Sequence, residues 1–351
     1  MDPSLFDYPL RPEQIAQSPV EPRDASRLFV LHRASGRIEH RIFRDIAHYT
    51  RPGDVLVLND SRVMAARLWA RRRPRGGRVE LLLLHPVEPA AEQATVARWE
   101  ALVRPGKRAL VGQVLDVGEG ELEARVVART ESGGRVVEFV SGTGESVGAL
   151  LKRHGRVPLP PYIRRPLADP ERYQTVYAGP EGSAAAPTAG LHFTRELLER
   201  LASEGVRLAP LTLHVGVGTF RPVRSATVEG HRMHAEYYRI PEPTARAIEE
   251  ARRRGARVWA VGTTVVRALE SACGPDGAVR TGSGWTELFI YPGYRFRVVD
   301  VLVTNFHLPR STLLMLVCAF AGTRQVLEAY RTAAEMGYRF YSFGDAMLLL
   351  P

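Results

Sequence analysis

Short apolar runs recur along this chain, and several lead straight into a polar turn. The run Asp54–Leu58, for example, is apolar after its first residue and ends at Asn59-Asp60-Ser61-Arg62. Continuous apolar runs of this length are typical of strands covered on both faces, and amphipathic segments between them are typical of surface helices. The pattern predicts strands at Ser26–Leu31, Asp54–Leu58, Arg207–Leu213, Arg257–Val261 and Val298–Val303, and helices at Arg195–Glu204, Thr244–Arg254 and Leu313–Phe320.

The stretch from residue 66 to 156 has a different pattern. Its short apolar runs are separated by glycine-rich turns such as Gly118-Glu119-Gly120, Ser132-Gly133-Gly134 and Gly142-Thr143-Gly144. Regular short strands with turn signals and no long helix predict a small antiparallel β-barrel. The expected barrel strands are Val79–Leu84, Val96–Val103, Gln113–Val117, Leu122–Ala128 and Val136–Val140. The fold class that follows is α/β: a discontinuous α/β main domain, 1–65 plus 157–351, with an inserted small antiparallel β-barrel domain at 66–156.

The turn Thr304–Thr312 concentrates polar chemistry between two apolar elements. It follows the strand-like run Val298–Val303 and precedes the helical run Leu313–Phe320. Open α/β sheets bind ligands where strands end and helices begin, and the backbone N–H groups of a helix start suit an anion. A connection made for packing would need fewer polar groups, so this turn predicts a ligand site.

Two further segments bring a histidine to a similar position. Ala185–Thr194 surrounds His192 with small residues that allow a close backbone approach, although a capped loop with a satisfied histidine is the alternative. In Leu213–Phe220, His214 follows a strand, and its imidazole can act as an acid or a base because it titrates near neutrality. The Gly-x-Gly of this segment lacks the third glycine and the helix of a dinucleotide fingerprint, so we exclude NAD.

Two more segments have patterns that suit ligand binding at a helix start or metal binding. Val258–Glu270 has the pattern of a strand, a Gly262-Thr263-Thr264 turn and an amphipathic helix. The N–H groups and hydroxyls at such a helix start suit a carboxylate or phosphate, and an ordinary cap is the alternative. In His231–Glu236, two histidines and a carboxylate could begin a metal site, but zinc needs further ligands and the chain has no HExxH helix. We expect polar contacts there rather than a metal.

Composition excludes several classes of protein. At 351 residues, with 45% apolar and 25% charged residues, the chain is an ordinary globular protein of two domains. No apolar run approaches the ~20 residues of a membrane helix, and the N-terminus lacks the basic and apolar parts of a secretory signal. Cys273 and Cys318 form no disulfide framework and fit a reducing cytoplasm. Ser311 is not in a Gly-x-Ser-x-Gly elbow, which disfavours a serine hydrolase.

The formal charge of +10 suggests a polyanionic partner. Among 48 basic residues only Lys107 and Lys152 are lysines, and arginine forks match phosphate and stack on bases. An arginine-biased genome is the alternative. We expect Arg71–Arg75 in an exposed loop, with phosphate contact as the other interpretation. Aromatic residues near the polar segments could stack unpaired bases, although many will be core. They are Tyr162, Tyr173, Tyr177, Phe220, Tyr237, Tyr238, Tyr291, Tyr294 and Tyr341.

With these segments in order, the chain resembles the S-adenosylmethionine:tRNA ribosyltransferase-isomerase family of queuosine synthesis nearly end to end. Many long ungapped segments make the resemblance specific. Besides the segments above, it is carried by Phe6–Tyr8, Ile15–Gln17, Pro22–Leu28, Leu58–Val63, Arg172–Tyr177, Phe289–Tyr294 and Tyr338–Met347. This chain departs from the family at Arg11, Val265 and Phe343, where proline, serine and tyrosine are usual.

The resemblance implies a monomeric cytoplasmic enzyme with an α/β domain and an inserted barrel. It implies that the ribosyl moiety of S-adenosylmethionine is transferred and isomerised onto 7-aminomethyl-7-deazaguanine at the wobble position of tRNA. The products are epoxyqueuosine-tRNA, adenine and methionine. The implied partners are the tRNA anticodon stem-loop and S-adenosylmethionine, which is a consumed co-substrate, with no membrane, no bound cofactor and no metal.

This reaction needs three proton transfers: from C5′ beside the sulfonium, to the departing adenine, and from the acceptor amine. We expect His192, His214 and His307 to carry these protons, with Asp345 orienting one of them or holding a ribose hydroxyl. We expect Gly262, Thr263 and Thr264 to bind a carboxylate or phosphate, and Asn305 to bind adenine or the modified base. Arg310 and Ser311 are expected to bind an anionic part of the substrate. The arginines expected to contact tRNA are Arg23, Arg27, Arg310 and Arg339.

Two other functions remain open at this point. A non-catalytic RNA-binding protein would use the arginines and the barrel, but it would have little need for buried-type His, Asn and Asp residues in turns. A tRNA methyltransferase would use the same co-substrate and release S-adenosylhomocysteine instead of adenine and methionine.

Overall fold

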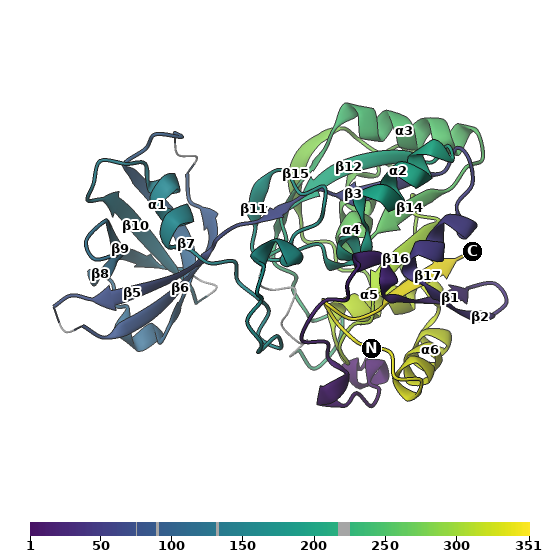
Figure 1. Ribbon diagram of the computed structural model, residues 1–351, viewed down its shortest axis with the longest axis horizontal. Coiled ribbons are helices and arrows are strands. Elements are labelled where there is room, and N and C mark those ends of the chain that lie inside the picture. Colours follow the sequence, from purple (N-terminus) through teal and green to yellow (C-terminus); the bar gives the residue numbers. More distant parts are fainter. Residues whose placement is uncertain (75, 89–90, 131–132, 217–224) are drawn as a thin grey trace. The chain divides into compact units, whose positions relative to one another are not determined.

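The structure is a computed structural model that describes residues 1–74, 76–88, 91–130, 133–216 and 225–351 (Figure 1). The chain forms two compact units. The α/β unit comprises Met1–Arg62, Pro160–Pro180 and Ala186–Pro351, and the barrel unit comprises Val63–Leu159 and Glu181–Ala185. The chain therefore leaves the α/β unit, builds the barrel unit and returns, so the barrel is an insertion.

Within the described residues, nine strands of the α/β unit form one mixed sheet. In spatial order they are β15 (Gly282–Thr286), β13 (Glu236–Ile240), β12 (Arg207–Leu213), β3 (Val55–Asn59), β14 (Val258–Val261), β16 (Val301–Asn305), β17 (Ala346–Leu350), β1 (Arg27–His32) and β2 (Ile38–Ile42). The helices of this unit are α2 (Arg195–Ser203), α3 (Glu242–Arg253), α4 (Thr263–Ala272), α5 (Thr312–Ala321) and α6 (Thr323–Glu335). Short 3-10 helices are η1 (Pro3–Phe6), η2 (Pro12–Gln14), η3 (Arg23–Ala25), η4 (Phe43–Tyr49), η6 (Pro170–Tyr173) and η7 (Thr188–His192).

The centre of the sheet is buried on both faces, as its unbroken apolar runs predict. Alternate residues such as Leu56 and Trp259 pack in one core with Phe43 of η4 and Leu197 of α2. The residues between them in the strands, for example Val57, are also fully buried. Large apolar side chains on both faces therefore hold the central strands rigidly.

The four central strands end together at one edge of the sheet. β12, β3, β14 and β16 are mutually parallel, with Leu211 beside Asn59 and Val261 beside Val303. The polar segments that follow these strands consequently converge, although they are far apart in sequence. Figure 1 shows these strands side by side in the α/β unit.

The barrel unit contains a closed antiparallel barrel. In spatial order, within the described residues, its strands are β10 (Arg135–Ser141), β7 (Val96–Arg104), β6 (Arg78–Pro86), β5 (Arg67–Arg72), β8 (Val114–Val117) and β9 (Leu122–Arg129). The remaining elements are α1 (Val147–His154), η5 (Gly106–Arg108) and the paired short strands β4 (Arg62–Val63) and β11 (Glu181–Ser183). The predicted fold class, an α/β protein with an inserted small antiparallel β-barrel, is confirmed.

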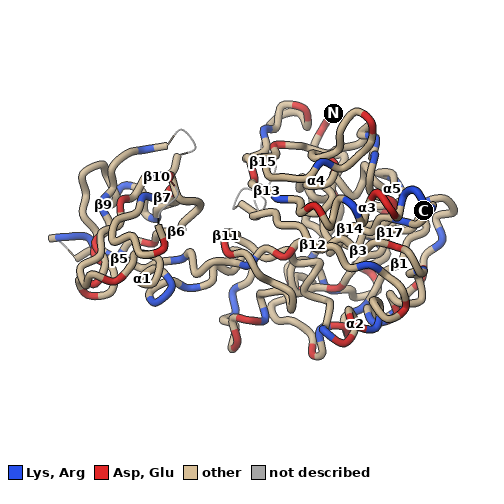
Figure 2. The backbone as a smooth tube through the Cα atoms, turned by 90° about the horizontal axis from the view of Figure 1, so that it is seen from above, with Lys and Arg blue, Asp and Glu red and all other residues tan. Residues whose placement is uncertain are grey.

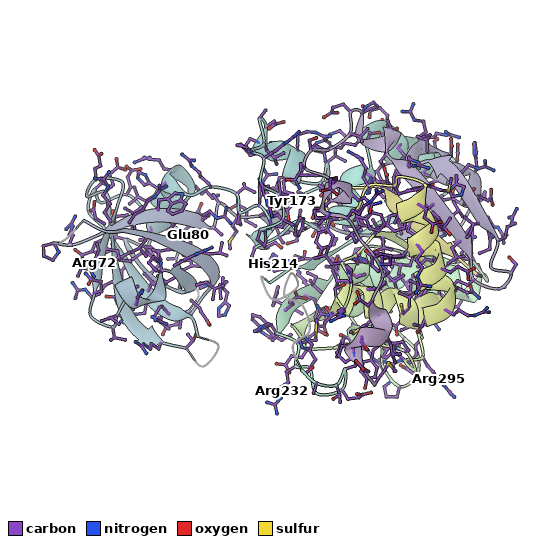
Figure 3. The ribbon with its side chains drawn as sticks, turned by 90° about the horizontal axis from the view of Figure 1, so that it is seen from below. Arg72, Glu80, Tyr173, His214, Arg232 and Arg295 are labelled. Atoms are coloured by element: carbon purple, nitrogen blue, oxygen red, sulfur yellow. The ribbon has the colours of Figure 1, made fainter. Side chains whose placement is uncertain are left out.

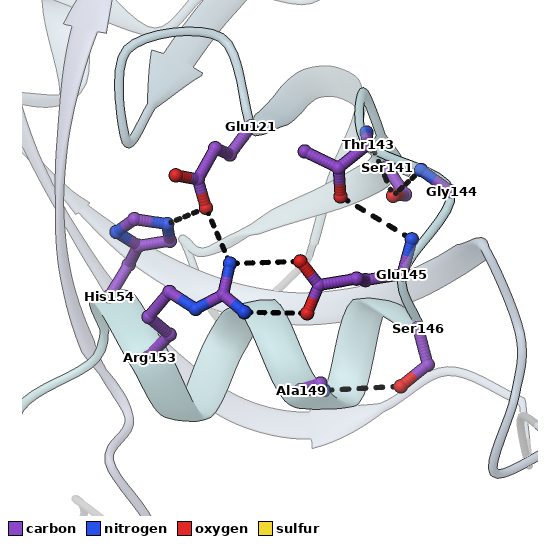
Figure 4. A network of polar contacts seen from close by, with 9 residues as sticks. All are labelled: Glu121, Ser141, Thr143, Gly144, Glu145, Ser146, Ala149, Arg153 and His154. Carbon is purple, nitrogen blue, oxygen red and sulfur yellow. Dashed lines mark hydrogen bonds and ion pairs between the residues drawn. The ribbon is translucent and has the colours of Figure 1, made fainter.

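Polar caps and ion pairs fix α1 in the barrel unit (Figure 4). The Ser146 hydroxyl caps the helix by accepting a hydrogen bond from the backbone N–H of Ala149 at 3.3 Å. Near the other end of the helix, Arg153 bridges Glu121 and Glu145, and Nε2 of His154 lies 2.9 Å from Glu121. The helix is thus tied to the barrel turns at both ends.

Several sequence-based predictions were incomplete. Arg71 and Arg72 belong to strand β5 and not to a loop, and Arg75 lies outside the described residues. The predicted strand Val298–Val303 begins only at Val301, because the Glu270 carboxylate accepts the N–H groups of Val298 and Val299. The sequence analysis also did not anticipate α1, α6 and the strands β2, β13, β15 and β17.

Charge and hydrophobicity are distributed as in a globular protein. Figure 2 shows Lys and Arg interspersed with Asp and Glu along both units. Within the described residues, no single helix is long and apolar enough to cross a membrane. Helices α5 and α6 meet those criteria only as a pair, and the chain bends by 116° between them.

Candidate active site at the carboxyl edge of the sheet

A pocket opens where the central strands of the α/β unit end. The space between its walls, about 540 Å³, includes a part that is open to solvent. Five of the residues selected from the sequence line it: Gly262, Thr263, Thr264, Asn305 and His307. The sheet edge therefore brings together segments that the sequence separates.

His307 presents its ring to this pocket from the turn after β16. Its Nε2 lies 2.7 Å from the hydroxyl of Thr304, and its backbone N–H donates to the Tyr330 hydroxyl at 3.2 Å. Within the described residues, Nδ1 has no hydrogen-bond partner. Burial lowers the pKa of the His307 imidazole to about 3, because a charged ring would lose its hydration. A neutral ring with one open nitrogen faces the pocket.

His192, at the end of η7, has both ring nitrogens occupied. Nδ1 lies 2.7 Å from the hydroxyl of Ser26, and Nε2 lies 3.0 Å from the amide nitrogen of Asn305. The ring also stacks on Phe43, with centroids 5.0 Å apart. Burial and the nearby cations Arg339 and Arg23 lower the pKa of His192 to about 3. His192 is therefore a neutral, fully bonded side chain.

Asn305 determines the tautomer of this histidine. Its amide nitrogen also lies 3.2 Å from the carbonyl oxygen of Tyr341, which can only accept, so this atom is the NH₂ group. The same NH₂ group donates to Nε2 of His192, and we assign the ring proton to Nδ1, which donates to Ser26. The amide oxygen of Asn305 accepts from Thr188 at 3.1 Å. The carboxamide is thus held in one orientation at the pocket wall.

His214 stands beside the pocket and not in its lining. Its Nδ1 lies 2.7 Å from the Ser61 hydroxyl, its ring stacks on Tyr237, and burial lowers its pKa. The neighbouring residue Val215 lines the pocket instead. Figure 3 labels His214 in the α/β unit. The Val217–Phe220 part of this predicted segment lies outside the described residues.

Gly262 turns the chain from β14 into α4. Its φ of +94° is in the left-handed region, and its N–H donates to the carbonyl of Val303 at 2.7 Å. The N–H of Val265 donates to the Gly262 carbonyl at 3.2 Å, so the N–H groups at the start of α4 that lack an intrahelical acceptor are those of Thr263 and Thr264. Both residues line the pocket and form a wall suited to an anion. The amide of Asn59 donates to the Thr264 hydroxyl at 3.3 Å, which ties this wall to β3.

Asp345, Ser311 and Arg310 are used in local structure. The Asp345 carboxylate accepts the backbone N–H groups of Arg27 and Arg339, and it contacts none of the three candidate histidines. Burial raises its pKa, and these hydrogen bonds oppose the rise. Ser311 caps α5 by accepting from the N–H of Leu314 at 3.2 Å. Exposed Arg310 forms an ion pair with Asp7.

Like Arg310, the other arginines predicted to contact tRNA, Arg23, Arg27 and Arg339, also brace the protein. Arg23 donates to the carbonyls of Gln174 and Leu191, and it lines a smaller second pocket together with His192. Burial and the neighbouring Arg172 lower the pKa of Arg23 to about 10. The Arg27 guanidinium lies 3.6 Å from the centre of the Tyr338 ring, and Arg339 donates to the carbonyl of Ser18 at 3.2 Å.

The predicted metal alternative at His231–Glu236 is disfavoured by the use of its carboxylate. Glu236 forms a buried ion pair with Arg267 and accepts the N–H of Gly216 at 2.8 Å. Among the described residues, no group of three or more His, Cys, Asp or Glu side chains could hold a metal.

The sequence analysis did not select several residues that shape the site. Ser26 and Thr188 hold the His192–Asn305 pair, and no motif at positions 26 and 188 would have indicated this. Tyr341, named from the sequence only as a possible base-stacking residue, adopts an unusual φ of +75° for a non-glycine residue, and its ring packs on Tyr162 with centroids 4.0 Å apart. Strained backbone conformations of this kind are concentrated at functional sites, but no sequence pattern predicts them.

Comparisons with known proteins show the family of this chain. The model of the family described as Queuosine biosynthesis protein matches residues 3–349. A relative from Moorella thermoacetica, named S-adenosylmethionine:tRNA ribosyltransferase-isomerase, is 59% identical over 98% of both chains. One of the same name from Symbiobacterium thermophilum is 57% identical over 99% of both.

A solved structure is similar along its whole length. The crystal structure of S-adenosylmethionine tRNA ribosyltransferase from Thermotoga maritima is 45% identical, with a TM-score of 0.57. The match covers 99% of this chain and 100% of that chain. The chain therefore belongs to the queuosine biosynthesis protein family of S-adenosylmethionine:tRNA ribosyltransferase-isomerases.

Proposed function

We propose that this protein transfers and isomerises the ribosyl moiety of S-adenosylmethionine onto 7-aminomethyl-7-deazaguanine in tRNA, releasing adenine and methionine. The observation that carries the proposal is the full-length match to relatives named for this activity. The pocket supports it, because its wall combines an anion-binding helix start with neutral imidazole and carboxamide groups. S-adenosylmethionine carries an anionic carboxylate and a base with hydrogen-bonding edges, which these groups suit.

Within this proposal, the pocket geometry separates the roles of the histidines. His307 is the candidate proton carrier at the pocket, because it lines the wall and keeps Nδ1 open. His192 is neutral and bonded at both nitrogens, so we assign it the positioning of Asn305 in place of proton transfer. His214, beside pocket-lining Val215, remains the second candidate carrier.

The substrate contacts follow from the same wall. The start of α4 at Gly262-Thr263-Thr264 seats the methionine carboxylate or a tRNA phosphate. Asn305 contacts the adenine edge or the modified base, and Asp345 acts on the site through the backbone of Arg27 and Arg339. Ser311 and Arg310 serve an anionic part of the substrate only if their present contacts with Leu314 and Asp7 open.

The proposal extends to the setting of the reaction. We propose a cytoplasmic monomer in which residues 1–65 plus 157–351 form the catalytic domain and residues 66–156 the inserted barrel. The RNA partner is the tRNA anticodon stem-loop, with Arg23, Arg27 and Arg339 as candidate contacts. S-adenosylmethionine is a consumed co-substrate, and the enzyme uses no bound cofactor or metal.

Chromatography of the small-molecule products tests this function. The protein is incubated with S-adenosylmethionine and precursor-modified tRNA, and the soluble fraction is separated. Equal amounts of adenine and methionine, formed only when tRNA is present, are expected. S-adenosylhomocysteine would identify a methyltransferase, and intact S-adenosylmethionine with bound tRNA would identify a binding protein; either result overturns the proposal.

A further inference from the structure

The outer end of the sheet carries an exposed aromatic ladder. Trp285 on edge strand β15 is 61% exposed, and it lies directly opposite Tyr237 on β13, with ring centroids 5.7 Å apart. Tyr237 in turn stacks on His214, with centroids 5.7 Å apart and planes 22° from parallel. We call these residues the Trp285–Tyr237–His214 ladder. It runs from solvent to the residue next to pocket-lining Val215.

The ladder occupies the solvent face of this part of the sheet. The alternate residues Glu236, Ile240 and Thr286 of the same two strands point the other way and are buried. Glu236 pairs there with Arg267 of α4, so that face belongs to the core. The side bearing Trp285 is therefore not needed to hold the sheet on its helices.

A cation lies on the same face as the ladder. Arg239 is two residues beyond Tyr237 on β13, so its side chain leaves the strand on the same side, and it is exposed. Among the described residues it makes no ion pair within 4.0 Å. An exposed indole and an exposed guanidinium on one face of the sheet offer a π-face and a phosphate contact together.

This combination indicates the chemistry of the partner. Tyr and Trp are enriched at interaction surfaces relative to the rest of a protein's surface. Unpaired nucleotides are bound by stacking their bases on aromatic rings while cations neutralise the backbone. The exposed Arg239 guanidinium and the net charge of +10 favour a polyanion.

We propose that Trp285 is a stacking platform for an unpaired base of the RNA substrate and that Arg239 contacts an adjoining phosphate. The base concerned lies in the same loop as the nucleotide that enters the pocket, because the ladder ends beside Val215. This proposal rests on the proposed function for the identity of the RNA as tRNA. The binding surface itself lies wholly within the α/β unit.

Equilibrium binding of precursor-modified tRNA, measured without S-adenosylmethionine, tests the platform. Trp285→Ala is expected to weaken binding by about 5-fold to 100-fold, the usual effect of losing one stacked base. Trp285→Phe keeps a ring and is expected to stay within a few-fold of the unchanged protein. Leu5→Ala is the matched control, because Leu5 is 56% exposed in the same unit and belongs to η1 and not to the ladder. Equal affinity of Trp285→Ala and Leu5→Ala would overturn the proposal.

Two further readouts distinguish stacking from a folding defect. Stacking of a base on Trp285 quenches its fluorescence, so the quench on adding tRNA is expected to shrink in Trp285→Phe although that variant still binds. Arg239→Gln is expected to lower the slope of log Kd against log salt by about one. A full quench in Trp285→Phe, or an unchanged salt slope in Arg239→Gln, would contradict the respective assignment.

The outcome is separable from that of the proposed function. In turnover assays Trp285→Ala is expected to raise KM for tRNA with little change in kcat, because stacking is retained equally in the ground and transition states. If the wild-type protein releases adenine and Trp285→Ala binds tRNA as tightly as the wild type, the stacking platform is rejected and the proposed activity is supported. If no adenine is released but RNA binds tightly and depends on Trp285, the proposed activity is rejected and the stacking platform is supported.

Discussion

The amide nitrogen of Asn305 donates a hydrogen bond to Nε2 of His192 across 3.0 Å. This contact joins the end of β16 to the end of η7, and it fixes the carboxamide at the pocket wall. It also fixes the histidine as a neutral acceptor at Nε2, because the other hydrogen of the NH₂ group goes to the carbonyl of Tyr341. Two side chains that the sequence analysis treated as separate site residues thus work as one unit.

The first prediction concerns His192 as a positioning residue. His192→Ala removes the acceptor for one hydrogen of the Asn305 amide and the ring partner of the Ser26 hydroxyl, so kcat/KM is expected to fall by about 10-fold to 100-fold, matching about 1–3 kcal/mol per lost buried partner. The shape of the pH–rate profile should not change, because a neutral ring contributes no ionisation. His192→Gln, which keeps an acceptor, should recover part of the rate. Loss of an ionisation from the profile in His192→Ala would instead make His192 a proton carrier.

The second prediction concerns stability at acid pH. The folded-state pKa of about 3 for His192 and for His307 lies below the ordinary 6.5 of histidine. The unfolded chain therefore binds more protons between those values, so stability rises with pH through this window and levels off above it. Each ring contributes at most about 1.4 kcal/mol per pH unit in the window.

Urea unfolding of wild type and of His192→Gln at pH 5 and pH 7 measures this effect. The wild type should lose more free energy of unfolding on going to pH 5 than the variant does. An identical loss in both proteins would show that His192 keeps an ordinary pKa in the folded state.

The third prediction concerns His307. His307→Asn should lower kcat by about 10²-fold to 10⁴-fold while tRNA binding and the thermal midpoint change little, because proton transfer depends on the imidazole. Thr304→Val is the companion variant, since it removes the hydroxyl 2.7 Å from Nε2 but leaves the ring in place. It should reduce kcat less than His307→Asn does. Near-normal turnover of His307→Asn would remove this residue from the mechanism.

The fourth prediction concerns the helix start at Gly262. Gly262→Ala should cost about 1–2 kcal/mol in stability, because φ is +94°, and it should raise KM for S-adenosylmethionine by displacing the first N–H groups of α4. A steric clash of the added Cβ does not contribute to the loss of stability, since the nearest atom, Cβ of Ala189, would be 3.5 Å away.

Gly293→Ala is the matched control for this variant. Gly293 has a φ of +104°, and an added Cβ would meet nothing within 4 Å. It should show a similar loss of stability with an unchanged KM. Equal KM values for the two variants would mean that the α4 start does not hold this substrate.

The sequence predicts the strand ends well and the contacts between them poorly. Runs such as Asp54–Leu58 are readable because burial on both faces demands continuous apolar residues. Strand β5, Arg67–Arg72, was missed because its outward-facing arginines resemble an exposed loop. The barrel buries one face of that strand, and Leu68 and Ala70 on that face are too few to stand out.

The same limit applies to the site. Thr263 and His307 could be selected because a polar turn after a buried strand is itself a signal. The Ser26–His192 contact spans 166 positions and depends on how η7 packs against η3, which no local pattern encodes. For the same reason, the ion pair between Arg310 and Asp7, which are 303 positions apart, was not anticipated. The Ser311 cap joins residues only three positions apart, but the polar turn led us to expect a substrate contact there instead.

Mass spectrometry of the tRNA nucleosides tests the central claim most directly. Precursor-modified tRNA is incubated with the protein and S-adenosylmethionine, digested, and compared with a reaction containing His307→Asn. We expect the 7-aminomethyl-7-deazaguanosine residue to gain a cyclised ribosyl unit in the wild-type reaction. With His307→Asn this gain should be strongly reduced. Gain of a methyl group, or no change of mass with the wild-type protein, would contradict it.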